Sequence, residues 1–466
     1  MTPAQARDHA RERRGWYFYD WANSPFYSST TTVFGALYMS TVAAADAKQN
    51  ITLNGDSPCV DSAGADDKLS HCDVSLFGLH FPAGSLWGYL LAVATVVQVL
   101  VLPIAGAVAD RSRSKRRILG WFAALGALAS ALMFFMAGSN WQLGAALFVV
   151  ANIGYGGSLV VYYSFLTDIA GPDERDAVSA KGWAFGYLGG GLALGLQLAF
   201  YLSRDALDVD TGTAVRICFL TSGLWWALFT IPTLRALPRV HAPAGSRPGG
   251  TVLGAGFREL GRTVSAARQF PLTLAFLGSY LLFADGINTV VTVSAQYGKD
   301  ELRFSDEVLI ITVLVIQFLA YVGGTLHGLV ARRLGAKRTI LGSLVLWVVV
   351  LVGAYFVQPA HPVQFYAVAV GIGLVLGGTN ALSRSLFSQM IPAGKDAQYY
   401  SLYVVGEKGT SWLGPLVFAG VGQATGSFRL AIVALVAFFV LGFVFVALVP
   451  VRRAIVAAGN RPPELL

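Results

Sequence analysis

Charged residues are scarce in this 466-residue sequence. Asp, Glu, Lys and Arg together make up 13% of it, whereas ~25% is typical of soluble domains. A soluble chain of this length would need a charged surface that so few residues cannot cover. A disordered chain would combine high net charge with low hydrophobicity. The composition therefore excludes both classes.

Cysteine and histidine are also few. Three Cys residues exclude a small secreted fold held together by disulfides. Of the six His residues, His327 alone falls within an apolar run, and no second His or Cys follows at the spacing of metal ligands. The Gly-rich runs lack the lysine of a nucleotide-binding loop. We therefore expect no metal, no cofactor and no enzyme activity, and an intramembrane enzyme is a disfavoured alternative.

Long apolar runs are what the sequence has in abundance, with 55% hydrophobic residues. A helix that crosses a bilayer needs ~20 apolar residues, and transmembrane strands would instead alternate apolar and polar residues. The runs are continuous, which predicts an all-α polytopic membrane protein. Twelve transmembrane helices are predicted, at about residues 22–44, 84–108, 118–138, 143–167, 182–202, 214–234, 271–296, 308–330, 339–357, 363–387, 401–421 and 429–450.

The basic residues are distributed unequally between the two sets of loops. Of 34 Lys and Arg residues, 25 fall in the termini and the loops on one side. The positive-inside rule then predicts that both termini are cytoplasmic. The net charge of +8 is explained by basic loops that face anionic lipid, so no nucleic-acid partner is expected. We expect a monomeric, multi-pass protein of a bacterial inner membrane.

Two loops are longer than the others. The extracytoplasmic loop 46–82 contains Cys59 and Cys72, which could form a disulfide there or remain free. The cytoplasmic loop 235–270 separates residues 1–234 from residues 271–466, and its second half could be an amphipathic helix on the membrane. The sequence thus predicts two membrane domains joined by a cytoplasmic linker.

Internal repeats support this division. GAVADR, from Gly106 to Arg111, recurs as GLVARR from Gly328 to Arg333 at an offset of 222. Asp-Ala pairs at 176 and 396, each followed by Gly ten residues later, are offset by 220. Asp20 and Asn23 recur as Asp285 and Asn288, with the long loop 46–82 accounting for the larger offset. We infer two homologous halves of six helices each.

The spans, the two halves and the Gly-x-x-x-Asp-Arg loop resemble the major facilitator superfamily of secondary transporters. Four motifs resemble its vacuole-effluxer-like, autophagy-related branch: YDWANS (19–24), DGINT (285–289), LSRS (382–385) and GPL (414–416). The resemblance implies two six-helix bundles around a site near the bilayer midplane, built from helices 1, 4, 7 and 10, and export of amino acids. Arg113 and the run Tyr162 to Phe165 depart from the family pattern.

Five charged residues fall within the predicted spans, where each costs at least ~2.5 to 3.5 kcal/mol and needs a partner. With the repeated asparagines, they are our candidates for substrate binding or proton coupling: Asp20, Asn23, Asp285, Asn288, Arg384, Glu407 and Lys408. Gly286 marks a point where helix 7 could open. The alternatives are an N-cap or interfacial role for Asp20, a structural role for Asp285 paired with a neighbouring helix, neutralisation of Asp285 or Glu407 by Arg384, and snorkelling of Lys408 to the surface.

Two further groups of residues complete the predicted site. Tyr162, Tyr163 and Trp183 could line the cavity or merely pack. At the cytoplasmic ends of helices 2 and 8, charged side chains could form a gate that breaks when the halves rock, or be ordinary positive-inside charge: Asp110, Arg111, Arg332 and Arg333.

These features predict a secondary transporter that works by alternating access. Its expected substrate is a small amphiphilic solute, most simply an amino acid or short peptide, exported or exchanged, with proton coupling through Asp285 or Glu407 as an option. Transport of lipid-like or drug-like molecules is the alternative within this class. A non-transporting membrane sensor is the alternative from another class.

Overall fold

The computed structural model describes residues 3–55, 58–60, 68, 71–76, 78–112, 114–237, 261–263, 265–359 and 361–466. Most of the linker 235–270, and with it most of the predicted amphipathic helix, lies outside these residues. Side chains at 3–6 and at a few helical positions, Arg111 among them, also lie outside the description.

The first half of the chain forms a helical bundle. Its membrane helices are α1 (Pro3–Pro25) with η1 (Phe26–Phe34) and α2 (Gly35–Gln49), α4 (Leu86–Arg111), α5 (Lys115–Leu132), α6 (Trp141–Ser164), α8 (Arg175–Leu202) and α9 (Thr211–Ala236). Shorter elements connect them: α3 (Ile51–Asn54), β1 (Asp73–Leu76), β2 (Leu79–Pro82), η2 (Met133–Phe135), α7 (Leu166–Ile169) and η3 (Asp205–Leu207).

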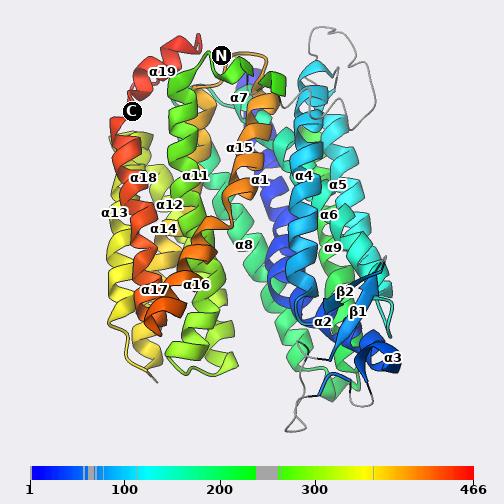
Figure 1. Cartoon of the computed structure of the whole chain (residues 1–466). Coiled ribbons are helices and arrows are strands. Elements are labelled where there is room, and N and C mark those ends of the chain that lie inside the picture. Colours follow the sequence, from blue (N-terminus) through cyan, green and yellow to red (C-terminus); the bar gives the residue numbers. More distant parts are fainter. Residues whose placement is uncertain are drawn as a thin grey trace.

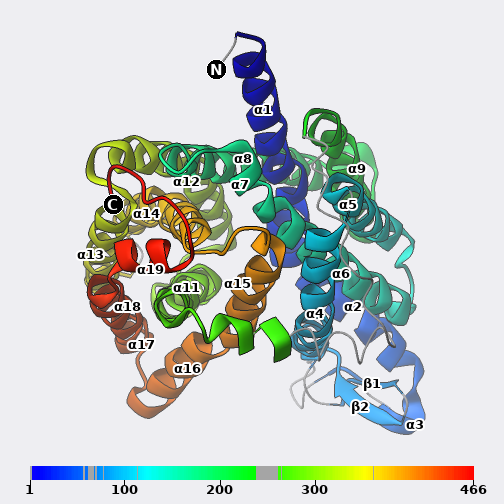
Figure 2. The same ribbon diagram turned by 90° about the horizontal axis from the view of Figure 1, so that it is seen from above.

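The second half forms a similar bundle. Its elements are α11 (Pro271–Gln296), η4 (Tyr297–Glu301), α12 (Asp306–Leu334), α13 (Ala336–Tyr355), α14 (Pro362–Gln389), α15 (Asp396–Thr410), α16 (Leu413–Thr425), α17 (Phe428–Ala434), α18 (Val436–Leu448) and α19 (Val451–Ala457). The two bundles lie side by side (Figures 1 and 2). The predicted all-α membrane fold with two six-helix halves is therefore confirmed.

Ten helical segments of the described chain are long and apolar enough to cross a membrane. The first and eleventh predicted spans are not among them because each is interrupted. In the first, helix begins well before residue 22, because the Ala- and Arg-rich segment after Pro3 favours helix, and the π-helix η1 follows. In the eleventh, turn residues at 411 and 412 separate α15 from α16.

The termini and the short strands lie at opposite ends of the molecule. Figure 1 shows the start of α1 and the C-terminal α19 at one end, which we call the terminal side. The hairpin of β1 and β2, in which Val74 pairs with Phe81, lies at the other end, which we call the hairpin side (Figure 1). A disulfide joins Cys59 to Cys72 beside this hairpin, whereas Cys218 is free and buried in α9.

Two seams join the halves, α4 with α15 and α8 with α12, and they are related by the sequence repeat. A Cβ atom on Gly106 of α4 would lie 2.5 Å from the carbonyl oxygen of Ala397. A Cβ atom on Gly328, the repeated position in α12, would lie 2.9 Å from Cβ of Ala180. The repeated glycines are thus positions where helices of opposite halves approach too closely for a side chain.

Candidate functional site

A cavity of about 210 Å³ lies between the two halves. Helices of both halves line it: α1, η1, α6 and α8 from the first, and α11, α12, α14 and α15 from the second. It extends from Asp20 and Asn380 towards Leu309 and Phe365, which lie near the hairpin-side starts of α12 and α14. The cavity therefore faces the hairpin side.

Most of the predicted site residues meet in this cavity. Its lining includes Asp20, Asn23, Tyr163, Trp183, Asn288, Glu407 and Lys408. Tyr162, Asp285 and Arg384 do not line it, and their contacts give them other positions. The sequence thus identified polar side chains from α1, α6, α8, α11 and α15 that converge between the halves.

Asp20 lies on the floor of the cavity, at its terminal-side end. Its Oδ2 accepts a hydrogen bond of 2.8 Å from the hydroxyl of Tyr162 and lies 3.5 Å from Nη1 of Arg384. Because α1 runs without interruption from Pro3 to Pro25, Asp20 is interior to the helix, and the N-cap alternative is wrong. Asp20 therefore links α1, α6 and α14.

Arg384 is fully buried directly beneath this floor. Its Nε donates to Oγ of Ser179 at 2.9 Å, and Nη2 donates to the Ser179 carbonyl oxygen at 3.0 Å. The guanidinium also lies against aromatic faces, an arrangement that stabilises a cation, with ring centroids 4.8 to 5.7 Å from Cζ: Trp16, Tyr162, Tyr163 and Trp183. The carboxylate that Arg384 contacts is Asp20, rather than the Asp285 or Glu407 considered from the sequence.

Asp285, in α11, lies outside the cavity, beside the break between α15 and α16 in the eleventh predicted span. Only 1% of its surface is exposed, and its Oδ2 accepts a 2.7 Å hydrogen bond from the backbone N–H of Gly414, at the start of α16. The seventh predicted span is α11, and its predicted opening at Gly286 is wrong. This helix is continuous, and Gly286 packs against Phe438 and Phe439 of α18. The interrupted span is instead the eleventh, which is divided into α15 and α16, and Asp285 caps the start of α16.

Glu407 and Lys408 lie in the last turn of α15, just before that break. Glu407 Oε2 accepts a 2.8 Å hydrogen bond from the hydroxyl of Tyr280. Lys408 Nζ lies 5.8 Å from the ring centroid of Tyr27, which belongs to the other half. Lys408 therefore points into the cavity rather than snorkelling to the surface, and the C-terminal end of α15 favours its charge.

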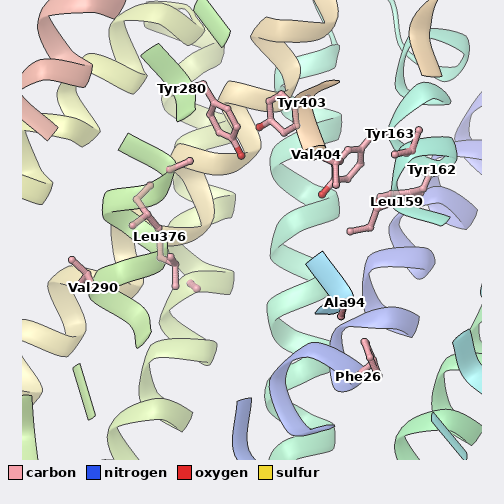
Figure 3. Packing of buried hydrophobic residues seen from close by; sticks show 14 of the residues in the cluster. Phe26, Ala94, Leu159, Tyr162, Tyr163, Tyr280, Val290, Leu376, Tyr403 and Val404 are labelled. Carbon is pink, nitrogen blue, oxygen red and sulfur yellow. The ribbon is translucent and has the colours of Figure 1, made fainter. Parts of the chain in front are cut away.

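An aromatic layer closes the cavity at its terminal-side end. Tyr280 stacks on Tyr403 with centroids 4.2 Å apart, and Tyr163 of the first half contacts Tyr400 at 5.6 Å and Tyr403 at 6.4 Å. Figure 3 shows Tyr163 and Tyr403 approaching each other between the two halves. This layer and Arg384 separate the cavity from the terminal side.

Hydrogen bonds between the halves reinforce this closure. Asp110, at the end of α4, accepts 2.9 Å hydrogen bonds from the backbone N–H groups of Ala397 and Gln398 in the first turn of α15, where a negative charge is favoured. Asp176 accepts a 2.6 Å bond from Ser385. Among the described residues, the hydrogen bonds that join the halves all lie on the terminal side of the cavity or at its floor.

The four predicted gate residues are therefore not equivalent. Asp110 lies at the interface between the halves. Arg332 and Arg333 are exposed in the last turn of α12, where their charges complement the helix end, and the side chain of Arg111 lies outside the description. The repeat places Arg332 where the first half has Asp110, so the carboxylate cap is present on one seam.

Several cavity residues were missed by the sequence analysis. They are mainly polar and aromatic: Ser24, Tyr27, Ser28, Thr32, Tyr155, Tyr187, Gln317 and Asn380. Three of them belong to the π-helix η1, a form often found at functional sites. Gln317 and Asn380 could have been found as polar side chains in the middle of apolar runs. The tyrosines carry no signal that separates lining from packing.

Comparison with known proteins is consistent with this architecture. The family described as "Vacuole effluxer Atg22 like" matches residues 8–459. The MFS-type transporter YxiO of Bacillus subtilis strain 168 is 29% identical, over 94% of this chain and 95% of its own. Autophagy-related protein 22 of Eremothecium gossypii is 28% identical, over 95% of this chain and 90% of its own.

Solved transporters share the fold at low sequence identity. The proton:xylose symporter XylE aligns with a TM-score of 0.65 and 12% identity, over 96% of each chain. FucP in its outward conformation aligns with a TM-score of 0.61 and 14% identity, over 89% of this chain and 97% of its own. The fold, the family match and the relatives agree, and the chain belongs to the vacuole effluxer Atg22-like family of major facilitator superfamily transporters.

Proposed function

We propose that the protein exports or exchanges amino acids or short peptides, as a monomer, by alternating access. One observation carries the proposal: a cavity that both halves line, closed on the terminal side and facing the hairpin side, contains two carboxylates and an ammonium group, those of Asp20, Glu407 and Lys408. Relatives named as Atg22 proteins and a family named for vacuolar efflux support the same reading.

The charges in the cavity suit a zwitterion. A solute with an ammonium and a carboxylate group loses its hydration in a narrow site and needs an opposite charge for each. Asp20 and Glu407 supply negative charge, and Lys408 supplies positive charge. Apolar and aromatic residues, including Tyr187 and Leu376, would contact a side chain.

Transport of lipid-like or drug-like amphiphiles is the second candidate, because aromatic rings line much of the cavity. Pockets for drug-sized ligands usually measure ~300 to 1,000 Å³, and the volume here is about 210 Å³. The size therefore favours a small solute.

The proposed orientation places the terminal side in the cytoplasm of a bacterial cell. Most of the basic loops lie on that side, as the positive-inside rule requires. The present conformation would then be open to the outside, which is the releasing state of an exporter. Rocking of the halves about the two seams would expose the same cavity to the cytoplasm.

Proton coupling is part of the proposal, with Asp285 or Glu407 as the carrier. A coupling carboxyl must be shielded from water in at least one state, and Asp285 is buried. Its Oδ1 has no hydrogen-bond partner in the described part of the chain, which leaves an oxygen available to hold a proton. Its bond to Gly414 would connect protonation to the position of α16.

Thermal unfolding of the purified protein tests the substrate class, because a ligand that binds the folded state raises its apparent stability. We expect a subset of amino acids or dipeptides to raise the melting temperature of the wild type and not of Lys408→Met, while Lys395→Met, on an exposed loop, behaves as wild type. Counterflow of the same solutes in proteoliposomes should follow. Stabilisation by amphiphiles alone would favour the second candidate instead.

A further inference from the structure

One face of α1 carries a row of arginines on the terminal side. Arg7, Arg11 and Arg14 follow each other at intervals of four and three residues, so they lie on the same side of the helix. All three are exposed. Ala10 and Gly15 flank this row, and because they have no bulky side chains, the guanidinium groups can converge on a single ligand.

Arg13 and Glu12, in the same segment, have partners of their own. Arg13 is paired with Glu174, with Nη1 3.0 Å from Oε1, and these hydrogen bonds lower the pKa of Glu174 below its ordinary value. Glu12 lies 3.5 Å from His9. Within the described residues, Arg7, Arg11 and Arg14 form no ion pair. Their charge is therefore available to a partner outside the chain.

A groove runs beside this row, between α1 and α9. The two helices meet where the Thr233 hydroxyl donates to the carbonyl oxygen of Gly15 at 2.8 Å. The groove has a volume of about 360 Å³, and its lining is Arg7, Ala10, Arg11, Arg14, Gly15, Phe18, Pro232 and Ala236. Figure 2 shows the start of α1 projecting beyond the rim of the bundle on this face, which leaves the groove open from the side.

Apolar and aromatic surface continues from the groove towards the middle of the membrane. Trp21 stacks on Trp225 at 5.7 Å between centroids, and Phe229 packs against both. Leu228, one turn from Pro232 on α9, is 61% exposed.

We propose that this groove binds the headgroup of an anionic phospholipid of the terminal-side leaflet, with its phosphate among Arg7, Arg11 and Arg14 and its acyl chains along the seam of α1 and α9. Arginine is suited to phosphate because its guanidinium donates two parallel hydrogen bonds. A soluble anion would use the arginines and not the apolar seam. The site is separate from the transport cavity and does not depend on the substrate.

The test compares phosphatidylglycerol, phosphatidylcholine and inorganic phosphate added to the purified full-length protein in detergent. We expect phosphatidylglycerol to raise the melting temperature and to remain bound in native mass spectrometry, and the other two to have little effect. Arg7→Gln/Arg11→Gln/Arg14→Gln should bind phosphatidylglycerol more weakly, on the order of 100-fold for three charges.

The control is Arg117→Gln/Arg338→Gln/Lys395→Gln, which removes the same charge from exposed terminal-side positions outside the groove. It should bind phosphatidylglycerol as the wild type does. Equal loss in both triple variants would show that net charge acts without a site, and would overturn the proposal. An equal response of the wild type to inorganic phosphate, or unchanged binding in the arginine variant, would also overturn it.

Discussion

Arg384 and Asp20 form a buried ion pair across the two halves of the protein, with Nη1 and Oδ2 3.5 Å apart. Asp20 also lines the cavity, so a cationic group of a bound solute would compete with Arg384 for the same carboxylate. Loss of that contact would release α14 from α1. The pair thus lies where substrate binding can affect closure of the terminal side.

The first prediction concerns Asp20→Asn, which removes the charge and keeps the size of the side chain. Breaking a buried ion pair from one side costs about 3–5 kcal/mol, and the cost falls on the closed terminal side. Ser388→Cys in a Cys218→Ala background provides a reporter, because Ser388 is buried on that side. A maleimide should alkylate it at least ~10-fold faster in the Asp20 variant. Asp208→Asn, at an exposed position, is the control, and equal rates in both variants would contradict the role of Asp20.

A second prediction tests the seam of α4 and α15. Gly106→Ala places a methyl group 2.5 Å from the Ala397 carbonyl oxygen, and such overpacking costs about 1–3 kcal/mol. The same cysteine reporter should therefore become more accessible, and solute release on the hairpin side should slow. Gly353→Ala is the matched control, since an added Cβ there meets no atom within 4 Å. If the reporter cysteine in Gly106→Ala is alkylated at the wild-type rate, the seam of α4 and α15 can separate without opening the terminal side.

A third prediction concerns the hairpin side. Cys59 and Cys72 are joined, and Cys218 is buried. If the hairpin side is extracytoplasmic, this disulfide should be present in the protein isolated from membranes. After denaturation, maleimide should then label Cys59 and Cys72 only if the protein has first been reduced. Cys218 should react in both cases once the chain is unfolded. Labelling of all three cysteines without reductant would place the loop on the reducing side and reverse the proposed orientation.

The sequence was most informative where polar residues interrupt apolar runs. Asp20, Asn288 and Glu407 were found in this way, because an intramembrane polar group carries a cost that only function or a partner explains. The partner of Arg384 was not found, since Asp20 and Arg384 are 364 positions apart and belong to different halves. The repeated glycines had indicated that the halves are homologous, but not that they mark the seams.

Local backbone changes were the other part that sequence reasoning could not supply. The π-helix η1 contains Tyr27 and Thr32, and its altered winding decides which of its side chains face the cavity. A helix break was predicted in α11, because Gly286 follows Asp285, whereas the break lies between α15 and α16. Tertiary packing decides the outcome: α18 packs against Gly286, whereas the turn before α16 is supported by the Asp285 carboxylate.

The last prediction separates two roles of Asp285, capping and proton transfer. Asp285→Asn keeps an oxygen that can accept from the Gly414 N–H, so folding and the break between α15 and α16 should survive. The amide cannot take up a proton. Asp285→Leu removes both functions. We therefore expect the Asn variant to have nearly the melting temperature of the wild type and to lose proton-driven uptake into proteoliposomes. The Leu variant should have a lower melting temperature, because the loss of a buried, charge-assisted hydrogen bond lowers the free energy of unfolding by about 1.5–3 kcal/mol.

Counterflow, which needs no proton gradient, distinguishes these outcomes. Asp285→Asn should retain counterflow if its defect is in coupling, and Glu407→Gln provides the comparison at the other candidate carboxylate. If the Asn variant keeps the pH dependence of the wild type while Glu407→Gln loses it, the coupling carboxyl is Glu407. Asp285 is then a structural cap, because a group that stays in one protonation state throughout the cycle cannot carry the proton.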